Sequence, residues 1–152
     1  MEVGFYFEEY TDDWSFQTAT LEITDDMIGR FVDLCGYNTP TFRNADYASK
    51  NYRGRMAPGM FVMSLAEGLC LNAGITRRRG IFAMEVNPKF LKPTYAGDTI
   101  TNVITLKSKR LTSKPDRGVV ITDHDVRNQN GETVISYTST RMIRTREFVE
   151  AT

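Results

Sequence analysis

The 152-residue sequence has little of several features, and each shortage argues against a class of protein. It has only two cysteines, Cys35 and Cys70, without C-x-x-C spacing. We therefore expect buried, reduced thiols rather than a disulfide or a metal site. No apolar run approaches the roughly 20 residues of a membrane span, and the first residues have no signal-peptide pattern. These absences predict a cytoplasmic protein without a membrane partner.

An excess of charge of one sign is also missing. Lys plus Arg and Asp plus Glu both number 19, so no net field favours nucleic acid as a partner. Hydrophobic residues make up 41% of the chain and charged residues 25%, as in ordinary globular domains. No linker, repeat or low-complexity tract divides the sequence. We therefore predict a single domain over residues 1–152.

One segment, from Pro58 to about Ala73, is apolar on nearly every face and predicts an enclosed central helix. At 1.5 Å per residue it is about 24 Å long, which matches a curved sheet of about five strands. We expect Met60, Phe61 and Met63 in the core, and close approach of strands at Ser64, Ala66 and Gly68. The pattern predicts an α+β fold with an antiparallel sheet wrapped around this helix.

The rest of the chain supplies the strands and their connections. Runs rich in β-formers predict strands at residues 16–23, 81–90, 98–110, 118–127 and 133–144. Thr24 is a plausible N-cap for a short helix that reaches Leu34 and ends at Gly36. Asn130-Gly131 predicts a tight hairpin turn, and residues 37–58 predict a long, partly helical loop over the surface.

The segment from Val86 to Thr101, VNPKFLKPTYAGDTIT, connects two of these strands by a corner. A strand ends at Phe90, Pro93 interrupts the ladder, and Gly97 precedes the next strand. This order resembles the FxxPxxxGDxL signature of MaoC-like hotdog dehydratases, a family that includes R-specific enoyl-CoA hydratases. The likeness continues in GRMAPGMFVMSLAEGL and VRNQNGETV.

The resemblance implies a single hotdog domain that forms a homodimer, or a heterodimer with a second hotdog chain. It also implies an acyl-CoA or acyl carrier protein thioester as substrate, with CoA or phosphopantetheine part of that substrate and no separate cofactor. The reaction implied is hydration of a 2-enoyl thioester or the reverse dehydration.

The family's acid–base pair lies in a GDxNPxH segment, whose counterpart here reads GYNTPTF. When the match is anchored on Gly36 and Pro40, Tyr37 replaces the Asp and Phe42 replaces the His. Thr39 replaces the Asn. By contrast, Pro58-Gly59-Met60 keeps the turn into the central helix, where the Gly59 N–H is a candidate donor to the thioester carbonyl. The resemblance thus implies substrate contacts at Thr39, Phe42, Gly59 and Met60.

Three residues are candidates for acid–base chemistry, and each has a plainer alternative. Tyr37 could donate a proton, but an ordinary phenol titrates near 10 and suits a pocket wall better. Asp46 could supply a carboxylate or stay solvated. Glu67, on an otherwise apolar helix, must face water, a partner or a site. The run Arg77, Arg78 and Arg79 either binds substrate phosphates or complements the helix dipole.

Three functions therefore stay open. The chain is a divergent lyase, the non-catalytic partner in a heterodimeric dehydratase, or a thioesterase with Glu67 or Asp46 as base. Cys35 with His124, the single histidine, is a further candidate pair of nucleophile and base.

Overall fold

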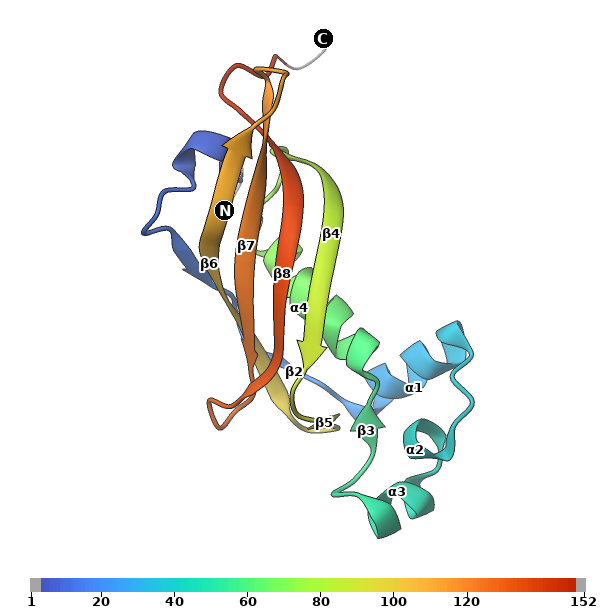
Figure 1. Ribbon diagram of the computed structural model, residues 1–152. Coiled ribbons are helices and arrows are strands. Elements are labelled where there is room, and N and C mark those ends of the chain that lie inside the picture. The colour runs from blue at the N-terminus through green and yellow to red at the C-terminus, as the bar shows by residue number, and fades with distance from the viewer. Residues whose placement is uncertain (1–3, 150–152) are drawn as a thin grey trace.

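The computed structural model describes residues 4–149 and is built on one antiparallel sheet and one long helix (Figure 1). The strands are β1 (Ser15–Gln17), β2 (Leu21–Glu22), β3 (Met56–Ala57), β4 (Gly80–Phe90), β5 (Thr94–Tyr95), β6 (Thr99–Leu111), β7 (Arg117–Arg127) and β8 (Thr133–Arg144). The helices are η1 (Phe7–Glu9), α1 (Asp25–Cys35), α2 (Pro40–Arg43), α3 (Ala45–Asn51) and α4 (Gly59–Asn72).

The main sheet has the strand order β1-β6-β7-β8-β4, with β2 also paired to β6, and every pair is antiparallel. The helix α4 lies against one face of this curved sheet, and α1, α2 and α3 form a lobe beside one end (Figure 1). Strands β3 and β5 make a separate two-stranded sheet. The predicted α+β architecture, a sheet around a central helix, is confirmed.

The predicted strand over residues 16–23 is in fact two short strands. Between them, Thr18 uses its side chain in place of its backbone carbonyl: its N–H donates to Asn102 O at 3.0 Å, and its Oγ1 accepts from Asn102 N at 3.0 Å. The hydroxyl takes over the place of the carbonyl in the ladder, so the chain leaves the strand after Gln17 and re-enters at Leu21.

The turn between β7 and β8 joins the predicted strand ends but is wider than a tight Asn-Gly turn. Arg127 pairs with Thr133, so five residues, 128–132, form the connection. The Asn128 side chain closes it, because its Oδ1 accepts from Asn130 N at 2.9 Å and from Glu132 N at 3.1 Å. Gly131 does supply the left-handed residue, with φ of 74°. The predicted hairpin and strand ends are therefore confirmed, but Asn130-Gly131 is part of a five-residue connection and not a tight turn by itself.

The central helix is less enclosed than its composition predicts. Its buried residues are Phe61, Val62, Met63, Ala66 and Cys70. Met60 is 54% exposed and Leu71 53% exposed, so placing Met60 in the core was wrong. At Gly68 an added Cβ would meet no atom of the described residues within 4 Å, so the expected close strand contact is absent there. One face of α4 remains open in the single chain.

The two cysteines have different environments. Cys70 is buried, as expected, whereas Cys35 is exposed at the end of α1, which corrects the prediction of two buried thiols. Both are free. Helix α1 otherwise follows its sequence signals: Thr24 Oγ1 accepts from Met27 N at 3.2 Å, and Gly36 ends the helix with φ of 73°. Within residues 4–149 no helix is long and apolar enough to cross a membrane.

The corner between β5 and β6 is fixed by a buried carboxylate. Asp98, which is 4% exposed, accepts hydrogen bonds from Tyr95 N, Gln129 Nε2 and Arg53 Nη2 at 2.7–2.9 Å. Burial alone would raise the pKa of Asp98. The hydrogen bonds and the Arg53 charge outweigh it and lower the pKa below 3.8. Gly97, with φ of 92°, provides the turn that delivers Asp98 to this site.

Candidate functional site

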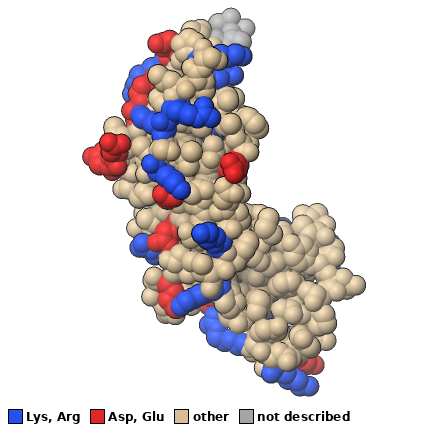
Figure 2. Space-filling model, viewed as in Figure 1, with Lys and Arg blue, Asp and Glu red and all other residues tan. Residues whose placement is uncertain are grey.

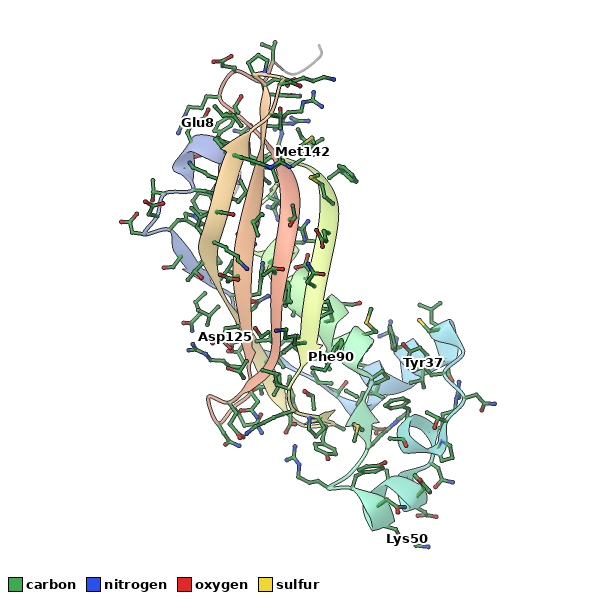
Figure 3. The ribbon with its side chains drawn as sticks, in the orientation of Figure 1. Glu8, Tyr37, Lys50, Phe90, Asp125 and Met142 are labelled. Atoms are coloured by element: carbon green, nitrogen blue, oxygen red, sulfur yellow. The ribbon has the colours of Figure 1, made fainter. Side chains whose placement is uncertain are left out.

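An apolar pocket of about 410 Å³ opens at the start of α4, where the lobe meets the sheet. Figure 3 shows Tyr37 on the lobe and Phe90 at the foot of β4, on the two sides of this region. The wall is assembled from loops, the helices α2 and α4, both small strands, and the strands β4 and β8. The lining residues are Tyr37, Phe42, Met56, Ala57, Pro58, Gly59, Met60, Val62, Phe90, Leu91, Lys92, Pro93, Thr94 and Ile135.

Aromatic side chains form the lobe side of the pocket. The ring centroids of Tyr37 and Phe42 are 5.8 Å apart, and Tyr37 also packs edge-on against Phe31 at 5.4 Å. The opposite wall, Phe90, lies so close to the start of α4 that a Cβ added at Gly59 would be 2.8 Å from its Cδ1. A glycine is therefore what allows the helix start and Phe90 to line the same pocket.

The start of α4 also brings hydrogen-bond donors to the pocket. The Pro58 carbonyl accepts from Phe61 N at 3.0 Å and from Val62 N at 3.1 Å. Gly59 and Met60 precede these residues, so their N–H groups have no acceptor within the helix. An N-terminal helix end carries a partial positive charge, which suits a carbonyl oxygen that becomes negative during a reaction.

The pocket lining is poor in acid–base groups. Of the lining residues in the described part of the chain, Lys92 is the charged one, and it is paired with Glu132. Among the described residues that line the pocket there is no carboxylate, histidine or cysteine. Tyr37 contributes a phenol group to the lining. The arrangement can hold an apolar chain and orient a carbonyl group. A carboxylate–histidine pair for proton transfer is not among its lining residues.

A family model for the FAS1-like dehydratase domain region matches residues 13–137. The chain belongs to this family. No curated protein matches the sequence.

Solved structures share the fold of this chain. This dehydratase-region chain superposes on a MaoC-like dehydratase from Rhodospirillum rubrum with a TM-score of 0.84, 21% identity and coverage of 95% of this chain and 100% of that one. The HadBC (3R)-hydroxyacyl-ACP dehydratase complex of Mycobacterium tuberculosis superposes with a TM-score of 0.71 and 23% identity, over 88% of this chain and 98% of that one. Rv0216, a double-hotdog protein of the same organism, superposes with a TM-score of 0.85 and 15% identity, over 98% of this chain and 47% of that one. The predicted hotdog fold and dehydratase–hydratase family are confirmed.

Most of the predicted substrate residues of this dehydratase-region chain meet in the pocket: Phe42, Gly59 and Met60 line it. Tyr37, a candidate for acid–base chemistry, lines it as well. Thr39 does not: it is the N-cap of α2. Its place as a substrate contact therefore stays a prediction.

The predicted catalytic carboxylates and the arginine run lie elsewhere. Asp46 is exposed in the first turn of α3, outside the pocket lining. Arg77, Arg78 and Arg79 follow the far end of α4, one helix length of about 20 Å from Gly59. The Arg79 guanidinium lies 3.8 Å from the centre of the Tyr6 ring. Phosphate binding by this run remains a prediction.

Glu67 belongs to a second, buried polar cluster between α4 and the sheet. Its carboxylate accepts from Tyr137 OH at 2.7 Å and is paired with Arg141. On the same side of the helix, Cys70 Sγ is 3.2 Å from Asn102 Nδ2. The sequence did not indicate this cluster, because its members come from α4, β6 and β8.

His124 completes the cluster from β7. Its ring nitrogens contact Thr122 Oγ1 at 2.8 Å and Asn102 Oδ1 at 3.3 Å, and its ring stacks on Tyr137 with centroids 4.1 Å apart. The residues that flank it, Asp123 and Asp125, alternate to the other face of the sheet and do not hydrogen-bond to it. With His124 buried and Cys35 exposed on α1, the structure does not favour a nucleophile–base pair of these two residues.

Burial keeps His124, Cys70 and Tyr137 in their neutral forms near neutral pH. It lowers the pKa of His124 to about 3, with a contribution from the Arg141 charge. It raises the pKa of the Cys70 thiol to about 12, helped by the nearby Glu67. Burial, followed by Glu67, also raises the pKa of Tyr137. The cysteine is therefore not an activated nucleophile in this arrangement.

Proposed function

We propose that this chain binds the acyl part of a CoA or acyl carrier protein thioester in the apolar pocket, and that it acts as the non-catalytic partner of a dehydratase. The observation that carries this proposal is the composition of the pocket. Apolar walls and the free N–H groups at the start of α4 suit an acyl chain and its thioester carbonyl. The lining has no carboxylate–histidine pair, so a second hotdog chain supplies the acid and the base.

The thioesterase alternative receives less support from the geometry. A catalytic carboxylate must reach the thioester carbonyl or its attacking water. Glu67 lines a different cavity and is held by Arg141 and Tyr137, while Asp46 is exposed on α3 outside the pocket. A lyase that uses Tyr37 is the remaining enzymatic alternative, because that phenol does line the pocket.

One assay separates these functions. The purified chain is incubated with short and medium trans-2-enoyl-CoA while enoyl absorbance and free thiol are recorded together, and binding of a saturated acyl-CoA is measured by calorimetry. We expect binding without enoyl loss and without thiol release. Enoyl loss would instead establish a lyase, thiol release would establish a thioesterase, and absence of acyl-CoA binding would overturn the proposed role of the pocket.

Replacement of Gly59 by Ala should weaken acyl-CoA binding at least tenfold. The new methyl group would lie 2.8–2.9 Å from the Phe90 ring and push that wall of the pocket aside. Gly68→Ala on the same helix is the matched control, because its Cβ would meet open space among the described residues. The control should bind normally and gain about 0.5–1 kcal/mol of stability. Equal affinities of the two variants would place the ligand elsewhere.

The edge strand β4 supports a second hotdog chain as partner. It is the last strand of the sheet, so one row of its backbone groups is unpaired, and residues 82–87 are all exposed. Large apolar side chains cover it: Phe82, Met84, Val86 and Phe90 are each 37–60% exposed. In the view of Figure 2 charged side chains are interspersed over the sheet, while much of the adjoining lobe is uncharged.

A charge on this edge should prevent dimer formation. We expect Met84→Lys to raise the dimer dissociation constant at least tenfold in sedimentation experiments, because association would bury the new ammonium group. Leu111→Lys, at an apolar residue that is 65% exposed on β6, is the control. A wild-type chain that stays monomeric in the presence and absence of other hotdog chains would contradict this interface.

A further inference from the structure

The buried cluster places three different metal-binding side chains around one point. Glu67 and Cys70 are three residues apart on α4 and therefore share a helix face, and His124 reaches them from β7. One ligand atom from each of them lies within 4.8 Å of the other two. Around a tetrahedral zinc ion such atoms are roughly 3.3–3.8 Å apart, so a contraction of about 1 Å would bring all three into coordination.

A small cavity adjoins these three residues. It measures about 30 Å³, enough for one or two water-sized species, and it is also lined by Trp14, Thr122 and Arg141. The indole Nε1 of Trp14, a residue that is 8% exposed, has no hydrogen-bond partner among the described residues. A water or another hydrogen-bond acceptor placed in this cavity would satisfy that buried donor.

The neighbouring side chains are arranged as supports for metal ligands. Asn102 Nδ2 is 3.2 Å from Cys70 Sγ, where a donor stabilises a thiolate. Thr122 Oγ1 holds one ring nitrogen of His124 at 2.8 Å, while the contact of the other nitrogen with Asn102 is long, at 3.3 Å. The weaker contact is the one that a metal ion would replace.

A surface hollow lies next to the buried cavity. A hollow of about 200 Å³ near Met142, which Figure 3 labels at the upper end of β8, shares Leu71, Thr76 and Arg141 with the buried cavity. The Arg141 side chain is 20% exposed and forms the ion pair with Glu67. This guanidinium therefore lies between the hollow and the cavity and competes with any cation for the carboxylate.

We propose that Glu67, Cys70 and His124 bind one thiophilic divalent cation of the zinc class, with a fourth position open to the cavity. A sulfur, a nitrogen and an oxygen ligand favour zinc or cobalt over magnesium or calcium. On binding, the Cys70 S–H bond breaks, a sulfur–metal bond forms and the proton leaves to water. The ion pair between Glu67 and Arg141 breaks, and the Glu67 carboxylate binds the metal ion instead. The site is separate from the thioester pocket and does not depend on its function.

Cobalt titration of the full-length chain tests this site, in a Cys35→Ala background because that exposed thiol could bind metal by itself. We expect a thiolate-to-cobalt charge-transfer band that saturates at one equivalent of Co²⁺ and disappears when Zn²⁺ is added. Adding Cys70→Ala should abolish the band, and His124→Gln should weaken Co²⁺ binding at least tenfold. A background protein without the band at millimolar Co²⁺, or a band that survives Cys70→Ala, would overturn the proposal.

Arg141→Met provides the sharper comparison. Removal of the competing cation should tighten Co²⁺ binding tenfold or more, because two positive charges no longer share one carboxylate. Should Cys70→Ala fail to fold by circular dichroism, Glu67→Gln replaces it, since the amide oxygen still accepts from Tyr137. Glu67→Gln should weaken Co²⁺ binding at least tenfold. Unchanged affinity in both Arg141→Met and Glu67→Gln would show that the carboxylate is no ligand and would reject the site.

Discussion

Replacement of Asp98 by Ala should lower the free energy of unfolding by about 3 kcal/mol, as measured by urea denaturation. The carboxylate is 4% exposed and accepts from the backbone of Tyr95 and the side chain of Gln129, two donors that would lose their acceptor. Arg53 contributes less, because its side chain is 60% exposed and water solvates it when the partner is removed.

The control for this variant is Asp116→Ala, which also removes an aspartate paired with an arginine, here Arg117. The Asp116 side chain is 32% exposed, against 6% for that of Asp98, so its loss should change stability less. If both variants lost the same stability, burial of the Asp98 hydrogen bonds would not be the source of the effect.

The Asp98 contribution should also depend on pH. Because the folded-state pKa lies below the ordinary 3.8, the carboxylate stabilises the folded protein fully above the unfolded value. The contribution is lost as the pH falls below 3.8 through the folded-state pKa. The stability difference between wild type and Asp98→Asn should therefore be constant near neutral pH and shrink at low pH. A difference that grew on acidification would contradict the assigned direction of the shift.

The double substitution Tyr37→Asp with Phe42→His should create enoyl-CoA hydratase activity. The two rings line the same pocket, 5.8 Å apart, beside the N–H groups that start α4. These are the positions at which the resemblance to MaoC-like hydratases implies the acid–base pair. General acid–base catalysis typically contributes about 10²- to 10⁴-fold, so a gain of at least 10²-fold over the wild-type chain is expected in the enoyl absorbance assay.

Tyr37→Asn with Phe42→Gln is the matched control, since it opens the same space without titratable groups. It should bind acyl-CoA and hydrate nothing. A folded Asp/His variant that binds acyl-CoA but shows no hydration would indicate that the pocket does not orient the thioester carbonyl as proposed. Activity in the control would point to a water held by groups outside the pair.

The elements with local signals were predictable from the sequence. Thr24 and Gly36 bound α1 through capping geometry that depends only on neighbouring residues, and the four long strands follow from β-prone runs between turn residues. The turn at Gly97-Asp98 was also predictable from the sequence. Part of the pocket lining was predicted from the sequence, because Gly59 and Phe42 lie in segments that resemble a known family.

The buried cluster was not predictable, since it depends on register between distant strands. His124 pairs with Tyr137 on β8, while Asn102 and Glu67 join them from β6 and α4, and the predicted strand ends alone did not set these pairings. In a strand, a shift by one residue turns every side chain to the opposite face. Apolar composition likewise could not show that Met60 lines a pocket while Met63 is buried, because both are apolar residues of one helix.

The pairing of β1 with β6 has a consequence for synthesis of the chain. Phe16 pairs with Ile104, so the first strand leaves the ribosome long before its partner exists. The apolar helix α4 also emerges before β6, β7 and β8, which cover it. During translation its hydrophobic surface has no sheet to pack against. Completion of the sheet therefore waits until β8 has been synthesised, and until then the apolar face of α4 is exposed to solvent.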